Sequence, residues 1–395
     1  MTKNKTIFSA GSYVFLIVLV PLVQLLEFFI VQGGVVSDTF VVGKSILPYI
    51  YIAIFFFILY KRKFRGIHLF IGIYFVLNSL LFSQFSIANN ASYMVQIVIT
   101  FSLLTLPRQR QIQLSEKNKI IILLVYCLII LLYYIFSKER FYEDRIYFVG
   151  FVIPHAFSYY CVAFAFFLMS IKRPLFSFIV LILGVFVGSR AGLLGAVLVC
   201  CYYFFGLATK KKIKITIISI AVLVCCIPLA SGVFADSSLG ITINKTLESF
   251  GSSNSAGKSS SDNTRTILLN NMLLKAASDG IGVENLFGRG PRSSYEYNER
   301  TLGLELWMHN DFAEVFFTLG IIGLLIYIYC LVYYYRTYRN IFSLLIIVVF
   351  GLTNGFFPYI PLTMILFFHL IDLRVGRRVL HATKSKALQL RINLP

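Results

Sequence analysis

Long apolar runs separated by short polar connections make up most of this chain. A helix needs about 20 apolar residues to cross a bilayer core of about 30 Å, and shorter runs suffice where helices tilt or the bilayer thins. The pattern therefore predicts an all-α polytopic membrane protein with about twelve transmembrane helices. They are expected at about 11–31, 39–60, 66–83, 93–106, 119–137, 147–171, 174–189, 191–206, 213–232, 311–335, 341–356 and 358–372.

Two of these assignments depend on the flanking charges. Residues 174–206 contain only Arg190 as a charged residue and, as one helix, would extend about 50 Å at 1.5 Å per residue. One span would put the basic clusters before and after it on opposite sides, so two short spans turning near Ser189 and Arg190 are favoured. The last pair, divided near Gly355–Pro358, has a re-entrant element as its alternative, although basic flanks favour an even number of crossings.

The distribution of charge orients the chain. Of its 395 residues 58% are hydrophobic and only 13% charged, and the net charge is +19. Such a positive charge can indicate nucleic-acid binding, but 24 of the 36 Lys and Arg lie in clusters on alternate connections between apolar runs, which is typical of cytoplasmic loops. We therefore expect a multi-pass protein of the bacterial plasma (inner) membrane with both termini cytoplasmic and no nucleic-acid partner.

The same alternation predicts four parts of the chain. Residues 1–232 form an N-terminal membrane bundle of about nine spans, whose first span is retained rather than cleaved. One large external loop follows at 233–310, then the C-terminal spans at 311–372 and a basic cytoplasmic tail at 373–395. No Lys, Arg, Asp or Glu lies at a clear midplane position, which argues against an ion-coupled transporter, because the sites of such transporters usually lie there.

The external loop carries the candidate chemistry. Residues 251–262 have the composition of a flexible linker, and residues 264–278 have the pattern of an amphipathic helix suited to the membrane surface. Asp262 or Thr264 is expected to cap this helix, which would place Arg265 in its first turn, where a phosphate can bind. Leu286–Arg292 is a glycine-rich turn containing Arg289. The loop ends at His309, Asn310 and Asp311, with Glu314 three residues later.

Several of these features, in their order along the chain, resemble the O-antigen ligase and polymerase (Wzy/WaaL-like) superfamily. They are Ser189–Leu194 after a span, Arg265 opening a helix, Leu286–Pro291, His309–Asn310 with Glu314, and Gly320–Leu325 entering the next span. The resemblance covers about residues 174–335 by motif and most of the chain by topology.

The resemblance implies a GT-C-like membrane glycosyltransferase that uses undecaprenyl-pyrophosphate-linked glycans. By position, Arg190 and Arg265 match the arginines associated with the donor pyrophosphate, and Arg289 is the third candidate. His309 matches the catalytic histidine. Asn310, Asp311 and Glu314 are its expected supporting residues.

The residue types fit this chemistry. Displacing a polyprenyl pyrophosphate develops negative charge on the leaving group, and Arg side chains can stabilise that charge through bidentate hydrogen bonds. The external stretch has no D-x-D pair and His309 is its only histidine, so we expect no metal and no other cofactor. His309 is the candidate general base, oriented by Asp311 or Glu314, or it only positions the acceptor. Direct displacement would invert the anomeric centre.

Composition favours one acceptor. The abundance of Ile, Phe, Lys, Asn and Tyr indicates a low-GC genome and a Gram-positive organism without a lipopolysaccharide core. This favours a capsular or exopolysaccharide polymerase that transfers the growing glycan onto the next lipid-linked unit, with the bilayer and other polysaccharide assembly proteins as partners. The alternatives are ligase-type transfer to another acceptor and a non-enzymatic flippase or exporter of lipid-linked oligosaccharide.

Overall fold

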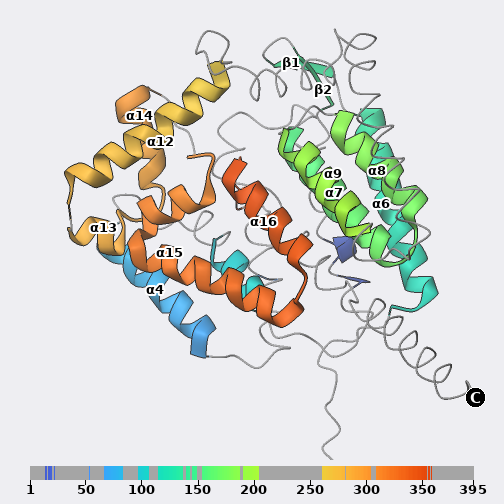
Figure 1. The fold of residues 1–395 in the computed structure, drawn as a ribbon, viewed down its shortest axis with the longest axis horizontal. Helices are drawn as coiled ribbons and strands as arrows, with labels where there is room; N and C mark the ends of the chain where they lie inside the picture. Colours follow the sequence, from blue (N-terminus) through green and yellow to red (C-terminus); the bar gives the residue numbers. More distant parts are fainter. Residues whose placement is uncertain are drawn as a thin grey trace, which may run out of the picture.

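A computed structural model describes the helices that surround the candidate site (Figure 1). It describes residues 66–82, 97–105, 114–136, 139–142, 145–148, 154–186, 190–203, 260–280, 282–303 and 308–353, with single positions near 14–22, 53 and 355–357. The elements are α4 (Gly66–Phe82), α6 (Glu116–Phe136), β1 (Glu139–Tyr142), β2 (Arg145–Phe148), α7 (Pro154–Ser170), α8 (Pro174–Phe186), α9 (Arg190–Cys201), α12 (Ser260–Ser278), α13 (Val283–Phe287), α14 (Ser293–Leu302), α15 (Asp311–Tyr338) and α16 (Ile341–Thr353). Residues 97–104 are also helical.

Helices occupy the described parts of most predicted spans. Within the described residues, α15 is the one helix that is both long and apolar enough to cross a membrane, and α4, α7, α8, α9 and α16 are shorter apolar helices. A single such helix also occurs in the cores of soluble proteins, so it does not establish the number of spans. The total of twelve remains a prediction. The spans predicted at 213–232 and 358–372, most of the first two, residues 251–259 of the predicted linker and the basic tail lie outside the described residues. The linker prediction is wrong for residues 260–262, which belong to α12.

The apolar segment from Pro174 to Cys201 folds as two antiparallel helices, α8 and α9. The hydroxyl of Ser158 on α7 donates to the Gly184 carbonyl on α8, whereas Ser177 near the start of α8 reaches Ala165 further along α7, so α7 and α8 run antiparallel. Helix α9 runs parallel to α7, because Gly195 lies against Val162 and Tyr202 against Phe166. The turn predicted near Ser189 and Arg190 therefore falls between the end of α8 at Phe186 and the start of α9 at Arg190.

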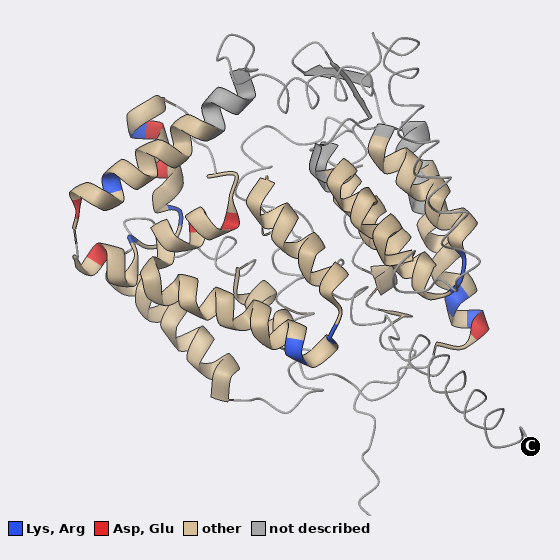
Figure 2. Ribbon diagram, in the orientation of Figure 1, with Lys and Arg blue, Asp and Glu red and all other residues tan. Residues whose placement is uncertain are grey.

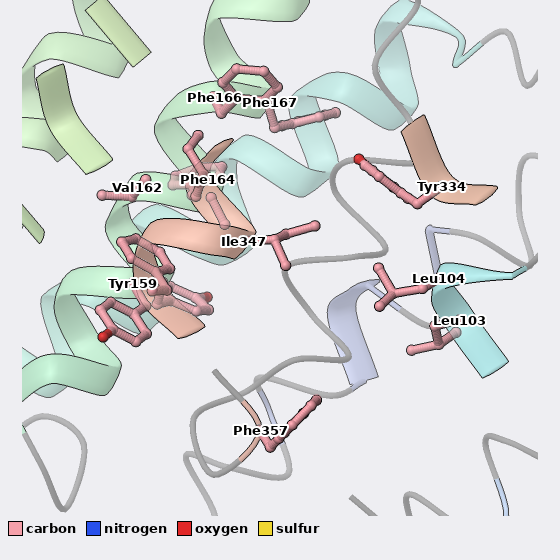
Figure 3. Close-up of a cluster of buried hydrophobic side chains, with 14 of the residues drawn as sticks. Leu103, Leu104, Tyr159, Val162, Phe164, Phe166, Phe167, Tyr334, Ile347 and Phe357 are labelled. Atoms are coloured by element: carbon pink, nitrogen blue, oxygen red, sulfur yellow. The ribbon is translucent and has the colours of Figure 1, made fainter. Parts of the chain in front are cut away.

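A buried aromatic core joins these helices to α16 (Figure 3). The rings of Tyr159 on α7 and Phe350 on α16 stack with their centroids 3.7 Å apart, and a Cβ at Gly195 would lie 2.8 Å from the Phe350 ring. Near the other end of α9, Tyr202 contacts Phe342. Helices α9 and α16 are therefore antiparallel, and Gly195 at their contact allows close packing, as small residues do in other membrane helix pairs.

The packing gives the helix assembly two ends. At one end, here called the junction end, α7, α9 and α15 begin and α8 and α16 finish. At the other, here called the basic end, the α7–α8 connection carries Lys172 and Arg173, and the α15–α16 connection follows Arg336 and includes Arg339. Figure 2 shows the bodies of α4, α7, α8 and α16 free of Lys, Arg, Asp and Glu. This arrangement agrees with basic connections gathered on one side of a bilayer.

The structure corrects the predicted start of one span. Residues 145–148 form strand β2, which pairs antiparallel with β1 in a register that places Glu139 opposite Phe148. Helix α7 begins at Pro154 rather than near residue 147. Proline favours the first turn of a helix, because its missing N–H is unpaired there in any case and its φ angle is already helical. Among the described elements, this hairpin is the exception to helical structure.

Candidate active site

The N-terminus of α15 is fixed by Asn310. The side-chain Oδ1 of Asn310 accepts hydrogen bonds from the backbone N–H groups of Phe312 (3.0 Å) and Ala313 (3.1 Å), which an uncapped helix would leave unpaired. Its Nδ2 donates to the carbonyl of Leu352 at 3.4 Å, near the end of α16. Asn310 thus starts α15 and ties it to α16 at the junction end.

Glu314 braces the same turn from inside. Its side chain is fully buried, and its Oε1 accepts a 2.6 Å hydrogen bond from the hydroxyl of Ser294 on α14. Its Oε2 accepts from the backbone N–H of Met308 at 3.4 Å. A buried carboxylate needs such partners, because it no longer has water molecules to donate hydrogen bonds to it. Glu314 therefore holds the residue before His309 and links it to α14.

His309 lies between these two fixed points. It is half-buried, and its backbone has φ of 53°, in the left-handed region that non-glycine residues rarely adopt. Such conformations persist only where neighbouring contacts impose them, and they are common at functional sites. Asn310, which caps α15, and Met308, whose backbone N–H binds Glu314, supply those contacts. The imidazole is therefore held at the N-terminus of α15.

Asp311 lies on the opposite side of the turn, toward α16. Its side chain is fully buried, and its Oδ1 accepts from the backbone N–H of Phe357 at 3.4 Å. A Cβ at Gly351 would lie 3.1 Å from its Oδ2, so the glycine leaves space for the carboxylate. Glu314 thus contacts the backbone directly before His309, whereas Asp311 contacts the backbone of Phe357, beyond α16. Together they fix the start of α15, where His309 lies.

Helix α12, which contains Arg265, packs against residues around this junction. Leu268 and Met272 of α12 are buried in a small cluster with Met308, Ala313 and Phe317. Arg265 precedes Leu268 by three residues, which is about one turn of α12. The side chain of Arg265 lies outside the described part of the structure. The expected cap at Asp262 or Thr264 is wrong, because α12 already includes both residues and begins at Ser260.

Arg190 is the first residue of α9 and so lies at the junction end. The pairing of Gly195 with Phe350, and of Tyr202 with Phe342, continues in register toward Arg190 and the end of α16. Asn310 contacts that same end of α16 at Leu352. The backbones of Arg190, Arg265 and His309 therefore approach one end of the helix assembly, although the side chain of Arg190 is not among those described.

Arg289 has a different environment from the one expected of a phosphate ligand. Its side chain is 9% exposed and pairs with Asp279 through Nη2, with a second acid, Glu284, at 3.6 Å from Nε. Nη2 also donates to Asn285 Oδ1 at 2.9 Å, and the guanidinium lies 4.5 Å from the centre of the Phe317 ring. These contacts join the end of α12 to α15, so Arg289 acts as a structural clamp.

The clamp changes the acidity of its partner. Burial raises the pKa of Asp279, but hydrogen bonds from Arg289 and Lys275, together with their positive charges, outweigh burial and lower the pKa to about 2. Asp279 is therefore a carboxylate at neutral pH and keeps the Arg289 guanidinium paired.

A feature missed by sequence reasoning is the direct contact between two glycine motifs. Helix α15 is interrupted at Gly320, whose φ of 68° and ψ of −171° are open essentially to glycine alone. Gly288 lies across this break, and a Cβ on either glycine would come within 2.5 Å of the opposing backbone. The backbone N–H groups of Arg289 and Gly290 donate to the carbonyls of Phe317 (3.2 Å) and Thr318 (3.0 Å). The turn after α13 thus fills the break in α15.

No described group of His, Cys, Asp and Glu side chains has the arrangement of a metal site. The polar groups that the described part of the structure brings to the junction are an imidazole, an amide and two buried carboxylates. This set can move a proton and fix an acceptor.

Comparison with protein families decides the assignment. Residues 175–328 match the family model described as O-antigen ligase. This match supports the resemblance of the chain to the O-antigen ligase and polymerase superfamily over that stretch. Comparison with curated proteins and with solved structures gave no match.

The O-antigen ligase domain contains every candidate site residue. It begins one residue into α8 and ends within α15, beyond the break at Gly320. Its boundaries enclose Arg190, Arg265, Arg289, His309, Asn310, Asp311 and Glu314. The match supports glycan transfer of the ligase or polymerase kind by an integral membrane protein as the general activity.

Proposed function

We propose that this chain is a polysaccharide polymerase that transfers a growing undecaprenyl-pyrophosphate-linked glycan onto the next lipid-linked repeat unit at the outer face of the membrane. The observation that carries the proposal is the position of His309, held at the mouth of α15 inside an O-antigen ligase domain. The approach of the Arg190 and Arg265 backbones to the same end of the fold supports it.

The reaction we propose is a single displacement. A hydroxyl oxygen of the incoming repeat unit attacks the anomeric carbon of the growing chain, and His309 takes the hydroxyl proton. The bond between that carbon and the pyrophosphate oxygen breaks, and undecaprenyl pyrophosphate leaves with the bonding electrons. The anomeric centre is thereby inverted.

Arg190 and Arg265 would stabilise the charge that develops on the leaving pyrophosphate. Their guanidinium groups suit bidentate binding of phosphate oxygens, and such pairs are strongest where water is excluded. We propose that this takes the place of a divalent metal. Arg289 is a weaker candidate for this role, because its guanidinium already pairs with Asp279 and packs on Phe317.

Reconstitution tests the proposal. Purified protein in liposomes with a lipid-linked repeat unit should produce a ladder of longer glycans. His309→Ala and Arg190→Ala should reduce the rate by about 100-fold or more, the scale expected for loss of a general base or a charge-stabilising group. Arg300→Ala on α14, whose side chain is 69% exposed, and His381→Ala in the tail are matched controls that should keep the ladder.

The same assay separates the alternatives. Glycan found only on a different added acceptor would indicate a ligase and overturn the polymerase assignment. Movement of the lipid-linked unit across the bilayer without new glycosidic bonds would indicate a flippase and reject the transferase. Full activity of His309→Ala would remove His309 from the mechanism.

A further inference from the structure

Helix α4 supplies polar side chains to the break in α15. The hydroxyl of Tyr74 donates to the carbonyl of Leu319 at 2.5 Å and lies 3.2 Å from the carbonyl of Phe287. The Nδ2 of Asn78 donates to the Phe287 carbonyl at 2.6 Å. Tyr74 and Asn78 are four residues apart, so they project from one face of α4.

These contacts complete the hydrogen bonding of the broken helix. In a continuous helix, the carbonyls of residues 317, 318 and 319 would accept from the N–H groups of residues 321, 322 and 323. Here the first two accept from Arg289 and Gly290, and the third accepts from Tyr74.

The surroundings make these two side chains hard to replace. Asn78 is 2% exposed, and much of the remaining surface of α4 is apolar and exposed, including Leu69, Leu77 and Leu81. In a membrane such a surface faces lipid, where water does not reach an unpaired carbonyl, and each unpaired group costs several kcal/mol. Removing Tyr74 or Asn78 would therefore leave backbone groups unpaired at the break itself.

The half-helix on one side of the break carries the proposed chemistry. Residues 311–319 follow His309 and the cap residue Asn310 in the chain. The remainder of α15 packs against α16 and the aromatic core. The angle between the two halves is set at Gly320, whose glycine backbone imposes little preference of its own. The side chains of α4 and the turn at Phe287–Gly290 therefore determine how the first half-helix presents His309.

We infer that Tyr74 and Asn78 are positioning residues of the transferase, which act through the break in α15 on the placement of His309. The inference rests on the proposed function. Neither residue needs to touch the glycan. A misplacement of about 1 Å at a reacting group can cost about 100-fold in rate, so a small reorientation of the half-helix would be visible in turnover.

Kinetics of Tyr74→Phe and Asn78→Leu test the inference. We expect each variant to lower kcat about tenfold or more, with KM for the lipid-linked unit changed less than threefold. Tyr335→Phe is the matched control, since Tyr335 is an exposed tyrosine of α15 beyond the break, and it should retain wild-type kcat. The melting temperature of each purified variant shows whether the fold has survived.

A double-mutant cycle distinguishes positioning from general damage. If Tyr74 acts through His309, adding Tyr74→Phe to His309→Ala should reduce the residual rate less than twofold, because the group being positioned is already absent. Multiplicative losses in the double variant would overturn the inference, as would unchanged kcat in both single variants. A fully active His309→Ala would instead refute the proposed function, so the two failures are distinguishable.

Discussion

At the scale of single residues, the ion pair between Arg289 and Asp279 differs from the surface charges of the region predicted to be external. Both side chains are largely shielded, whereas the neighbouring pair of Arg300 and Glu296 on α14 includes a 69% exposed arginine. Surface ion pairs contribute little to folding stability, because water and salt screen their charges. Breaking a largely buried pair costs more stability, because it leaves a charge without its partner. The clamp should therefore be important for stability.

Acid should weaken this clamp. The pKa of Asp279 lies near 2, below its ordinary value of 3.8, so its stabilisation is complete above about pH 5 and is lost as the pH falls toward 2. At pH 7, Asp279→Asn should lower the free energy of unfolding by about 1–3 kcal/mol, and the variant should lose less further stability than the wild type between pH 5 and pH 3. Thermal unfolding in detergent across this range measures both effects.

Glu296→Gln is the control for the acid prediction, because it removes an acid from an exposed pair on the neighbouring helix. It should change stability by less than about 0.5 kcal/mol at any pH. Equal pH profiles for the wild type and Asp279→Asn would show that the clamp does not contribute.

Glu314 provides a second residue-scale prediction. Glu314→Ala removes the acceptor for both Ser294 and the Met308 N–H inside a buried site. We expect loss of about 2–4 kcal/mol of stability and at least a tenfold lower rate of glycan extension. Glu299→Ala, at an exposed position of α14, should change neither quantity, and the ladder assay and thermal unfolding report them separately. Wild-type turnover by Glu314→Ala would show that holding Met308 is unnecessary.

At the scale of elements, α15 combines a feature that the sequence predicted with one that it could not. Its start at Asp311 was predicted because the polar junction and the apolar run are adjacent in sequence. Its interruption at Gly320 was not, because it depends on Gly288, which meets it only after folding. Likewise the pairing of Arg289 with Asp279 could not be predicted, because neither the turn nor the charge of Arg289 indicates it, and the binding of pyrophosphate by Arg289 stays a prediction.

The glycine contact gives a prediction for the break. Gly320→Ala would place a methyl group about where Leu286 and Gly288 backbone atoms lie, at a φ that alanine strongly disfavours. We expect this variant, and Gly288→Ala, to reduce the yield of folded protein several-fold. Gly72→Ala on α4 is the matched control, because nothing lies within 4 Å of its added methyl and alanine favours a helix. Size-exclusion recovery in detergent compares the three, and normal recovery of Gly320→Ala would contradict the described break.

At the scale of the whole molecule, the grouping of helix ends was the part of the architecture most accessible from sequence. Periodic basic clusters predicted that Lys172, Arg173, Arg336 and Arg339 share one side, and the antiparallel packing of α7, α8, α15 and α16 puts them at one end. The total number of spans and the four proposed parts of the chain remain predictions. Which helices touch could not be predicted, because apolar surfaces of similar composition do not specify their neighbours.

Thiol labelling tests the orientation of these ends. In intact cells, a membrane-impermeant maleimide should modify Glu299→Cys on α14, and should reach Lys172→Cys only after the membrane is permeabilised. Both positions are exposed in the structure. The wild type, with its native cysteines, sets the background. Labelling of both variants from outside would reject the predicted topology.

The contact between Gly288 and Gly320 has a consequence for engineering chimeric enzymes. Exchanging the predicted external loop between two relatives would ordinarily place the C-terminal boundary of the graft at His309, where polar sequence gives way to apolar sequence. Here that choice would combine one protein's turn with another's half-helix, although the two backbones are fitted to each other within van der Waals distance. A graft that extends through Gly323 keeps the matched pair together, so it offers the better route to transplanting sugar specificity.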